Sequence, residues 1–297
     1  MIAIDVMGGD HAPRVILEGA LAAAKKSIPI RLFGPEATIY QWLSQADSAW
    51  QNYPITINQA SDVIAMDEDP VFAVRKKASS SLVKAVASVA EGNSSAVLSA
   101  GNSGALMAAS ALIIGRKTNV ERPAIAGFLP TTKGNVLALD LGANTECRPA
   151  HLYQFAHLGH EFARDAMGIP HPRVALLSNG HEEGKGSLLV KQTHQLLKDG
   201  SVNFIGNAEP YDIFEHKADI LVTDGFSGNV LLKTMESVCE LVRGWVLDKA
   251  AIDSQLSHKN IGGALLLGVK QPVVVCHGNS DAFMIENAIK FAYKNCK

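Results

Sequence analysis

Short apolar runs rich in Val, Ile and Leu recur along the chain, and they lack a strict alternation with polar residues. That pattern is typical of strands that are covered on both faces of a sheet. The predicted strands lie at 2–6, 30–33, 55–57, 96–99, 136–139, 174–177, 202–205, 220–222 and 273–276. Helical periods separate most of them. We therefore predict a three-layer α/β/α fold around a mostly parallel, doubly wound sheet.

Two segments add detail to this pattern. The apolar run 120–130, the polar turn 131–135 and the next apolar run predict a small antiparallel hairpin, either at a sheet edge or as a dimer arm. The clearest helical period has apolar residues spaced by three and four, which predicts a stripe facing the core. Its members are Val230, Leu231, Met235, Val238, Val242, Trp245 and Val246. With no repeat or flexible linker, we expect one α/β domain over 1–297, which could consist of two closely joined lobes.

Six of the predicted strands are followed by a short patch rich in Gly, Asn, Ser and acidic residues. These patches lie at 7–11, 100–104, 140–144, 178–186, 224–229 and 277–281. In a parallel sheet the turns from strand to helix lie at one edge, so we expect the patches to converge on one crevice. Free backbone N–H groups, helix N-termini and small amides at such an edge favour an anion, above all phosphate.

Composition narrows the class of protein. The chain has 297 residues, of which 47% are hydrophobic and 19% charged, as expected for a compact globular protein. A net charge of -2 and no basic run longer than Arg75-Lys76-Lys77 argue against nucleic-acid binding. That triplet is either a solvated helix face or a docking point for an acidic partner.

The sequence lacks the motifs that would indicate export, a membrane span or a metal site. Met1 leads directly into the first predicted strand, and the longest uncharged apolar stretch, 104–115, is shorter than the roughly 20 residues that a membrane span needs. We therefore expect a cytoplasmic protein. Four scattered cysteines form no CxxC pair, and His157 and His160 do not belong to an HExxH motif, so no metal site is expected.

The patch at 178–186 superficially resembles a nucleotide-binding P-loop. It has three residues between Gly180 and Gly184, and Gly186 after Lys185, where a P-loop has four residues and Ser or Thr. No patch carries GxGxxG after a strand, so dinucleotide binding is also disfavoured. What remains is a glycine-rich turn with one lysine at a helix start, which suits a small anion. The alternative is a purely structural turn with a surface lysine.

Two further patches offer polar groups for catalysis. Asn229 follows a strand end, and its amide could bridge phosphate and a carbonyl oxygen, whereas Ser227 could be only an N-cap. In the last patch, Ser280 or Asp281 could cap the following helix. The chain has no GxSxG motif, so a serine nucleophile lacks its usual position. If phosphate is the nucleophile, positioning and oxyanion donors suffice.

Taken in order, the patches resemble the sequence blocks of the bacterial phosphate acyltransferases of the PlsX family. The matching blocks are IAIDVMGGDHAP at 2–13, SAGNSGA at 99–105, DLGAN at 140–144, the loop 179–186, TDGFSGN at 223–229 and HG at 277–278. The resemblance covers nearly the whole chain. It implies transfer of a long fatty acyl group from acyl carrier protein to inorganic phosphate, giving acyl phosphate for phospholipid synthesis, without a cofactor.

The resemblance also implies partners. Besides acyl carrier protein and inorganic phosphate, they are a second copy in a homodimer, the inner face of the cell membrane as a peripheral contact, and a downstream glycerol-phosphate acyltransferase. The family carries a longer helical excursion before the segment 262–268, where this chain has only 248–260. If that excursion contacts the membrane, this chain binds membranes weakly or by another route.

The second half is also similar, more distantly, to phosphotransacetylases. The two resemblances, together with the patches, indicate which residues bind phosphate, which take part in catalysis and which contact the rest of the substrate. The phosphate-binding set is Ser178, Asn179, Gly180, Lys185, Gly186 and Ser187. The catalytic set is Asn229, Ser280, Asn144 and Lys185, and the remaining substrate contacts are Gly9, Asp10, Asn102, Ser103, Asp224 and His277. A catalytic acid of the distant relatives falls near Asn287, whose amide cannot titrate. No general base is therefore assigned.

Three other functions stay open at this point. One is a short-chain phosphotransacylase that uses acyl-CoA, and another is a scaffold that binds acyl-ACP without turnover. A nicotinamide dehydrogenase of similar layered fold is disfavoured by the missing glycine fingerprint.

Overall fold

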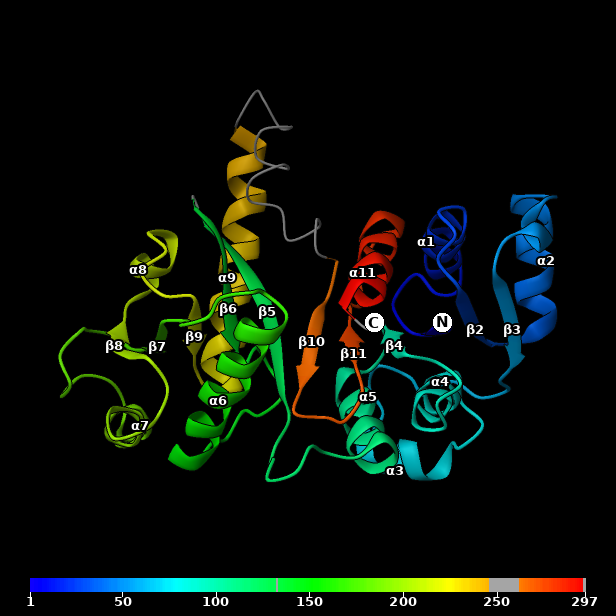
Figure 1. Ribbon diagram of the computed structural model, residues 1–297. Coiled ribbons are helices and arrows are strands. Elements are labelled where there is room, and N and C mark those ends of the chain that lie inside the picture. Colours follow the sequence, from blue (N-terminus) through cyan, green and yellow to red (C-terminus); the bar gives the residue numbers. More distant parts are fainter. Residues whose placement is uncertain (132, 246–261, 296–297) are drawn as a thin grey trace. The chain divides into compact units, whose positions relative to one another are not determined.

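The computed structural model describes residues 1–131, 133–245 and 262–295 (Figure 1). Contacts between residues divide the chain into two compact units. Unit 1 comprises 1–119 and 262–295, and unit 2 comprises 120–131 and 133–245. The short connection at 248–260 and Val246 of the predicted stripe lie outside the described residues. The single domain over 1–297 stays a prediction.

Unit 1 contains a mostly parallel sheet. Its strands follow the order β3 (Ile55–Gln59), β2 (Ile30–Gly34), β1 (Ile2–Asp5), β4 (Ala96–Ser99), β11 (Val273–Val275) and β10 (Ala264–Leu267). The first five are parallel to one another, and β10 is antiparallel to β11. Strand order reverses at β1, so β1 and β4 form the switch point at which ligands bind in open α/β sheets.

Helices cover both faces of this sheet (Figure 1). One face carries α1 (Arg14–Ala24), α2 (Glu36–Ala46) and α11 (Ala282–Asn295). The other carries α3 (Pro70–Lys76), α4 (Ser81–Ala90) and α5 (Ser103–Ala109), with the short helical turns η1 (Trp50–Asn52) and η2 (Ser110–Ile114) in the connections. Helices α1 and α11 approach closely at Gly19, where a Cβ would lie 2.7 Å from the carbonyl oxygen of Ala282.

The described part of unit 2 contains five strands, which helices also cover. Its strand order is β5 (Ala124–Thr131), β6 (Gly134–Leu139), β9 (Ile220–Val222), β7 (Val174–Leu177) and β8 (Phe204–Ala208). The hairpin β5–β6 is antiparallel, as predicted, and the other pairs are parallel. Helices α6 (Pro149–Asp165) and α7 (Leu188–Lys198) lie on one face, and α8 (Pro210–Phe214) and α9 (Gly225–Trp245) on the other (Figure 1).

The predicted fold class, a layered and mostly parallel α/β architecture, is confirmed in both units. Each of the nine predicted strands is present within a few residues of its expected position. Strand β10 was missed because its four residues, Ala-Leu-Leu-Leu, contain no β-branched or aromatic side chain and show no alternation.

The helix predicted after β9 is confirmed as α9, but its apolar stripe does not face the core of unit 2. Val230 and Val238 are each 50% exposed and Trp245 is 74% exposed. Of the α9 residues, only Gly225 and Gly228 are buried. Only the start of this helix packs tightly, because those two glycines let its first turn approach the loop after β6. Within the described ranges, no helix is both long and apolar enough to cross a membrane.

Candidate functional site

The six polar patches divide equally between the two units. In unit 1 they follow the adjacent strands β1, β4 and β11, and in unit 2 they follow the adjacent strands β6, β9 and β7. Within each unit the three strands are parallel, so their patches lie at one edge of the sheet. Convergence of all six on one crevice stays a prediction.

In unit 1 the three patches touch one another. The backbone N–H of Asp10 donates to the carbonyl oxygen of Gly278 at 2.8 Å. A Cβ on Gly8 would lie 2.6 Å from the nitrogen of Gly101. Gly9 has a φ of +108°, a backbone conformation that favours glycine. The predicted contacts Gly9 and Asp10 therefore stand on a tightly packed turn, with the Asp10 side chain exposed.

A buried carboxylate lies directly beneath these patches. Asp5, the last residue of β1, accepts hydrogen bonds from Ser81 Oγ at 2.5 Å and from Ser99 Oγ at 2.7 Å. Ser99 Oγ in turn accepts from the N–H of Gly101 at 3.0 Å. Burial raises the pKa of Asp5, and the hydroxyl donors oppose that rise. Sequence reasoning missed this residue, although an acid inside an apolar strand is itself a signal.

The side chain of Asn102 is engaged in holding the fold. Its Oδ1 accepts from the N–H of Ala105 at 3.0 Å and so caps α5. Its Nδ2 lies 3.1–3.3 Å from the carbonyl oxygens of Ala65, Met66 and Glu68. The amide thus anchors the turn at 65–68, while the neighbouring Ser103 is exposed on the first turn of α5.

The patch after β11 leaves one hydroxyl without a partner. Ser280 is 3% exposed, and within the described part of the chain its Oγ has no hydrogen-bond partner. The cap of α11 is Asp281, whose Oδ1 accepts from the N–H of Met284 at 2.9 Å. Ser280 is therefore not the cap, and its hydroxyl remains available to a ligand. His277 is half-buried beside it, and its carbonyl oxygen accepts from the N–H of Ser280.

In unit 2 another buried carboxylate organises the loop after β6. Asp140 is fully buried and accepts from the backbone N–H groups of Ile125, Gly142, Ala143 and Asn144 at 2.7–3.3 Å. It also accepts from Asn144 Nδ2 at 2.8 Å. Burial raises the pKa of Asp140, whereas the N–H donors of Ala143, Asn144 and Ile125 favour its ionised form.

Asn144 connects this loop to the start of α9. Its Nδ2 donates to the carbonyl oxygen of Pro123 at 2.8 Å as well as to Asp140. Its own carbonyl oxygen accepts from the N–H of Gly225 at 2.8 Å. A Cβ on Gly228 would lie 2.0 Å from the carbonyl oxygen of Asp140, so only glycine fits there. Both amide hydrogens of Asn144 therefore serve the fold.

Asp224 caps α9. Its Oδ1 accepts from the N–H of Ser227 at 2.8 Å, and its Oδ2 accepts from Ser227 Oγ at 2.9 Å. The proposed N-cap role of Ser227 was therefore wrong. Asn229, the fifth residue of α9, is exposed beside Gly142. A hollow of about 440 Å³ runs along the helix and is lined by Asn229, Val230, Lys233, Thr234, Ser237, Val238 and Leu241.

The loop 178–187 contains a second unpartnered hydroxyl, and we name this loop the phosphate loop after the ligand that the sequence predicts for it. Ser178 is 8% exposed, and its Oγ has no hydrogen-bond partner among the residues that the structure describes. Gly186 has a φ of +90°, and a Cβ there would lie 3.1 Å from this Oγ. Asn179 Oδ1 accepts from the N–H of Gly186 at 2.8 Å and closes the loop.

The end of the phosphate loop starts a helix and carries a cation. Ser187 Oγ accepts from the N–H of Val190 at 3.3 Å and caps α7. Lys185 is exposed, and its aliphatic stem passes over Gly180, where a Cβ would lie 2.8 Å from Lys185 Cγ. A helix N-terminus, a buried hydroxyl and a lysine together form a setting suited to a phosphate group.

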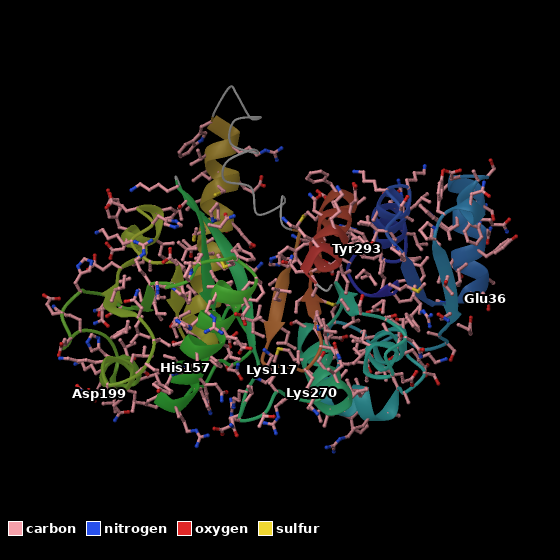
Figure 2. The ribbon with its side chains drawn as sticks, in the orientation of Figure 1. Glu36, Lys117, His157, Asp199, Lys270 and Tyr293 are labelled. Atoms are coloured by element: carbon pink, nitrogen blue, oxygen red, sulfur yellow. The ribbon has the colours of Figure 1, made fainter. Side chains whose placement is uncertain are left out.

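One histidine of α6 packs against an aromatic ring. His157, labelled in Figure 2, lies with its ring against Tyr153 at a centroid distance of 4.6 Å. Burial, together with the nearby His160, lowers the pKa of His157. Across 1–131, 133–245 and 262–295, no group of three or more His, Cys, Asp or Glu side chains could hold a metal ion.

Comparison with known proteins identifies the family. A family model described as fatty acid synthesis protein matches residues 1–297. The phosphate acyltransferase of Anaeromyxobacter sp. (strain Fw109-5) is 42% identical, over 97% of this chain and 85% of its own length. That of Heliobacterium modesticaldum is 44% identical, over 98% of this chain and 92% of its own length. The chain belongs to the phosphate acyltransferase (PlsX) family. Membership confirms the predicted class of enzyme, an acyltransferase.

Solved structures with the same fold include a phosphotransacetylase and a phosphotransacylase. A phosphotransacetylase from Streptococcus pyogenes aligns with a TM-score of 0.65 at 17% identity, covering 99% of this chain and 94% of its own. A branched-chain phosphotransacylase from Enterococcus faecalis V583 aligns with a TM-score of 0.63 at 17% identity, covering 100% and 99%. A 4-hydroxythreonine-4-phosphate dehydrogenase from Klebsiella pneumoniae aligns almost as well, at 0.62 and 16% identity over 100% and 99%. At this identity the likeness shows the fold alone.

Proposed function

We propose that this member of the phosphate acyltransferase family transfers a long-chain fatty acyl group from acyl carrier protein to inorganic phosphate. The product, an acyl phosphate, would supply phospholipid synthesis. The observation that carries the proposal is the phosphate loop. There the buried, unpartnered Ser178 hydroxyl, the N-terminus of α7 and the Lys185 side chain belong to one short segment. The family matches support phosphate as the acyl acceptor.

In the proposed reaction, an oxygen of phosphate attacks the carbonyl carbon of the thioester. A C–O bond forms, the C–S bond breaks, and the proton of hydrogen phosphate goes to the departing sulfur. Phosphate dianion is nucleophilic at neutral pH, and a thiol of pKa about 8.5 is a good leaving group, so little acid or base catalysis is needed. The protein's main contribution would be to position the reactants and stabilise the developing oxyanion.

We assign the oxyanion donor in unit 2 to Asn229. Its amide is exposed about one turn from the N-terminus of α9, and the helix dipole favours negative charge at that end. Asn144 would act through Asn229, because its amide is committed to Asp140 and Pro123 and its carbonyl holds the start of α9. In unit 1, Ser280 stays a candidate contact for the thioester, since its hydroxyl is buried without a partner in the described structure.

The length of the hollow along α9 favours a long acyl chain over a short one. The lining of the hollow begins at Asn229 and ends at Leu241. These residues are twelve positions apart on the helix, which corresponds to a length of about 18 Å. Val230, Val238 and Leu241 give it apolar contacts. The carrier protein, a second copy, a peripheral membrane contact and a downstream glycerol-phosphate acyltransferase belong to the same proposal. The family resemblance is their support.

The test is a reaction of purified protein with palmitoyl-ACP and phosphate. We expect acyl phosphate, trapped with hydroxylamine, and free ACP thiol in equal amounts. No product at saturating phosphate would contradict the proposal. Faster turnover of butyryl-CoA than of palmitoyl-ACP would identify a short-chain phosphotransacylase. Tight binding of palmitoyl-ACP without turnover would identify a scaffold.

A further inference from the structure

Three successive residues of the phosphate loop are tied to groups outside it. His181 Nε2 lies 2.6 Å from Asp212 Oδ2. The carbonyl oxygen of Glu182 accepts from Asn207 Nδ2 at 2.9 Å, and Glu183 Oε1 accepts from Lys198 Nζ at 2.7 Å. The first half of the loop is therefore anchored from β8, α8 and α7, whereas Lys185 remains exposed.

Two of these anchors, Asp212 and Asn207, are themselves buried and held in place. Asp212 is 3% exposed, and besides His181 it accepts from Lys217 Nζ at 2.6 Å and from the N–H of Glu209 at 2.8 Å. Asn207 is 8% exposed, and its Oδ1 lies 2.9 Å from Nδ1 of the buried His194. Buried polar side chains with several partners have a defined orientation, so these two present a defined geometry to the loop.

The bond from Asn207 decides the direction of one peptide group. The carbonyl of Glu182 also accepts from the N–H of Lys185 at 2.9 Å, which makes the turn that carries the lysine. In a trans peptide the C=O and N–H point in opposite directions, so a carbonyl drawn toward Asn207 cannot face an anion on the other side of the loop. A carbonyl oxygen that did face it would repel it.

We propose that Asp212 and Asn207 are positioning residues for phosphate: through His181 and the Glu182 carbonyl they hold the turn that presents Lys185 and Gly186. This inference rests on the proposed function, because it takes phosphate as the ligand of the loop. Neither residue needs to touch phosphate. A role confined to folding would predict lower stability without a selective effect on phosphate.

The test compares five variants by steady-state kinetics with palmitoyl-ACP, varying phosphate and acyl donor separately. His181→Ala removes the anchor to Asp212, and we expect the KM for phosphate to rise about tenfold, as for one charge-assisted hydrogen bond. The kcat and the KM for palmitoyl-ACP should stay within about twofold, because neither depends on the loop's affinity for phosphate. His181→Gln keeps an N–H donor of similar reach and should restore most of the affinity.

Lys26→Met is the matched control, since Lys26 Nζ donates to the buried Glu286 at 2.6 Å in unit 1, whereas the phosphate loop belongs to unit 2. We expect a lower Tm and an unchanged KM for phosphate. Asn207→Asp replaces the N–H donor by an oxygen that repels the Glu182 carbonyl, and should raise the KM for phosphate at least as much as His181→Ala.

Each other outcome overturns the inference. If Lys185→Ala raises the KM for phosphate while His181→Ala and Asn207→Asp leave it unchanged, the proposed function survives and the positioning role fails. If Lys26→Met raises it as much as His181→Ala, the effect is general destabilisation. If the wild-type protein makes no acyl phosphate, the function fails, and the inference fails with it.

Discussion

Each unit has one buried aspartate beneath its polar patches, and the two aspartates are held by different kinds of donor. Asp5 in unit 1 accepts mainly from the hydroxyls of Ser81 and Ser99. Asp140 in unit 2 accepts only from N–H groups, four of the backbone and one of Asn144. A hydroxyl can rotate and accept a hydrogen bond, whereas an N–H can only donate. The hydrogen bonds around Asp5 can therefore rearrange when the aspartate is replaced by asparagine, whereas those around Asp140 cannot.

The patches above these aspartates also differ in what they leave open to a ligand. Unit 1 leaves the Ser280 hydroxyl unpartnered among the described residues, next to the half-buried His277. Unit 2 leaves the Ser178 hydroxyl, and adds the exposed Lys185 and the capped N-terminus of α7. Only the unit 2 combination brings a positive charge, which is why we assign phosphate to unit 2.

The largest effect expected from this comparison is that of Asp140→Asn. Whichever way the amide points, its NH2 group faces N–H donors without an acceptor, so we expect a loss of about 3 kcal/mol in unfolding free energy. Urea denaturation of the variant and the wild type measures it. A loss below that of the matching change in unit 1 would contradict the comparison.

The second prediction concerns Asp212, a unit 2 aspartate whose pKa is shifted the opposite way from those of Asp5 and Asp140. Burial opposes its ionisation, but Lys217, the Glu209 N–H and His181 outweigh burial and hold the pKa at about 2. Because the folded pKa lies below the unfolded one, the resulting stability is present above pH 4 and is lost as the pH falls through about 2.

The stability difference between wild type and Asp212→Asn should therefore shrink as the pH falls from about 5 to 2, by roughly 2 kcal/mol according to the linkage relation. Urea denaturation across that range checks it. A difference that does not change with pH would show that Asp212 acts only as a neutral hydrogen-bond acceptor.

The third prediction separates the ligands of the two units. Lys185→Ala should raise the KM for phosphate about tenfold, corresponding to about 1.4 kcal/mol, because a charge that meets the anion is lost. Lys191→Ala, which removes an exposed lysine of α7, is the control and should have no effect. Ser280→Ala in unit 1 should raise the KM for palmitoyl-ACP and leave that for phosphate unchanged. The reverse pattern would place phosphate in unit 1.

The smallest effect is expected for Asp5→Asn. One of the two serine hydroxyls can rotate to accept from the new amide while the other still donates, so we expect a loss of about 1 kcal/mol or less. Urea denaturation beside Asp140→Asn gives the ratio of the two effects. Equal losses would show that the type of donor does not matter.

Several features could be predicted because they depend on neighbours in the sequence. All described strands except β10 were visible as apolar runs, and the patches could be placed at strand ends because the chain turns there. The hairpin β5–β6 followed from a polar turn between two apolar runs. The family followed from the order of the blocks, which is a property of the sequence itself.

Other features depend on residues far apart in the sequence, and only the tertiary structure decided them. The Asn102 amide, expected at the substrate, is bound by carbonyl groups up to 37 positions away. The helical spacing of the apolar residues on α9 predicted that this stripe is buried, but the stripe is largely exposed. Spacing shows that apolar residues share one face of a helix, and it does not show whether another element covers that face. Asp224 and Asp281, not Ser227 and Ser280, cap their helices, because several residues near a helix start can cap it and geometry selects one.

The sequence by itself thus determined the family, the layered α/β class and the positions of the polar patches. The tertiary structure decided which polar atoms in those patches are committed to the fold and which are left for a ligand. That division depends on hydrogen bonds over long sequence distances, such as the 31 positions between His181 and Asp212, and no local pattern encodes them. It leaves the Ser178 hydroxyl open and makes Asn144 part of the fold.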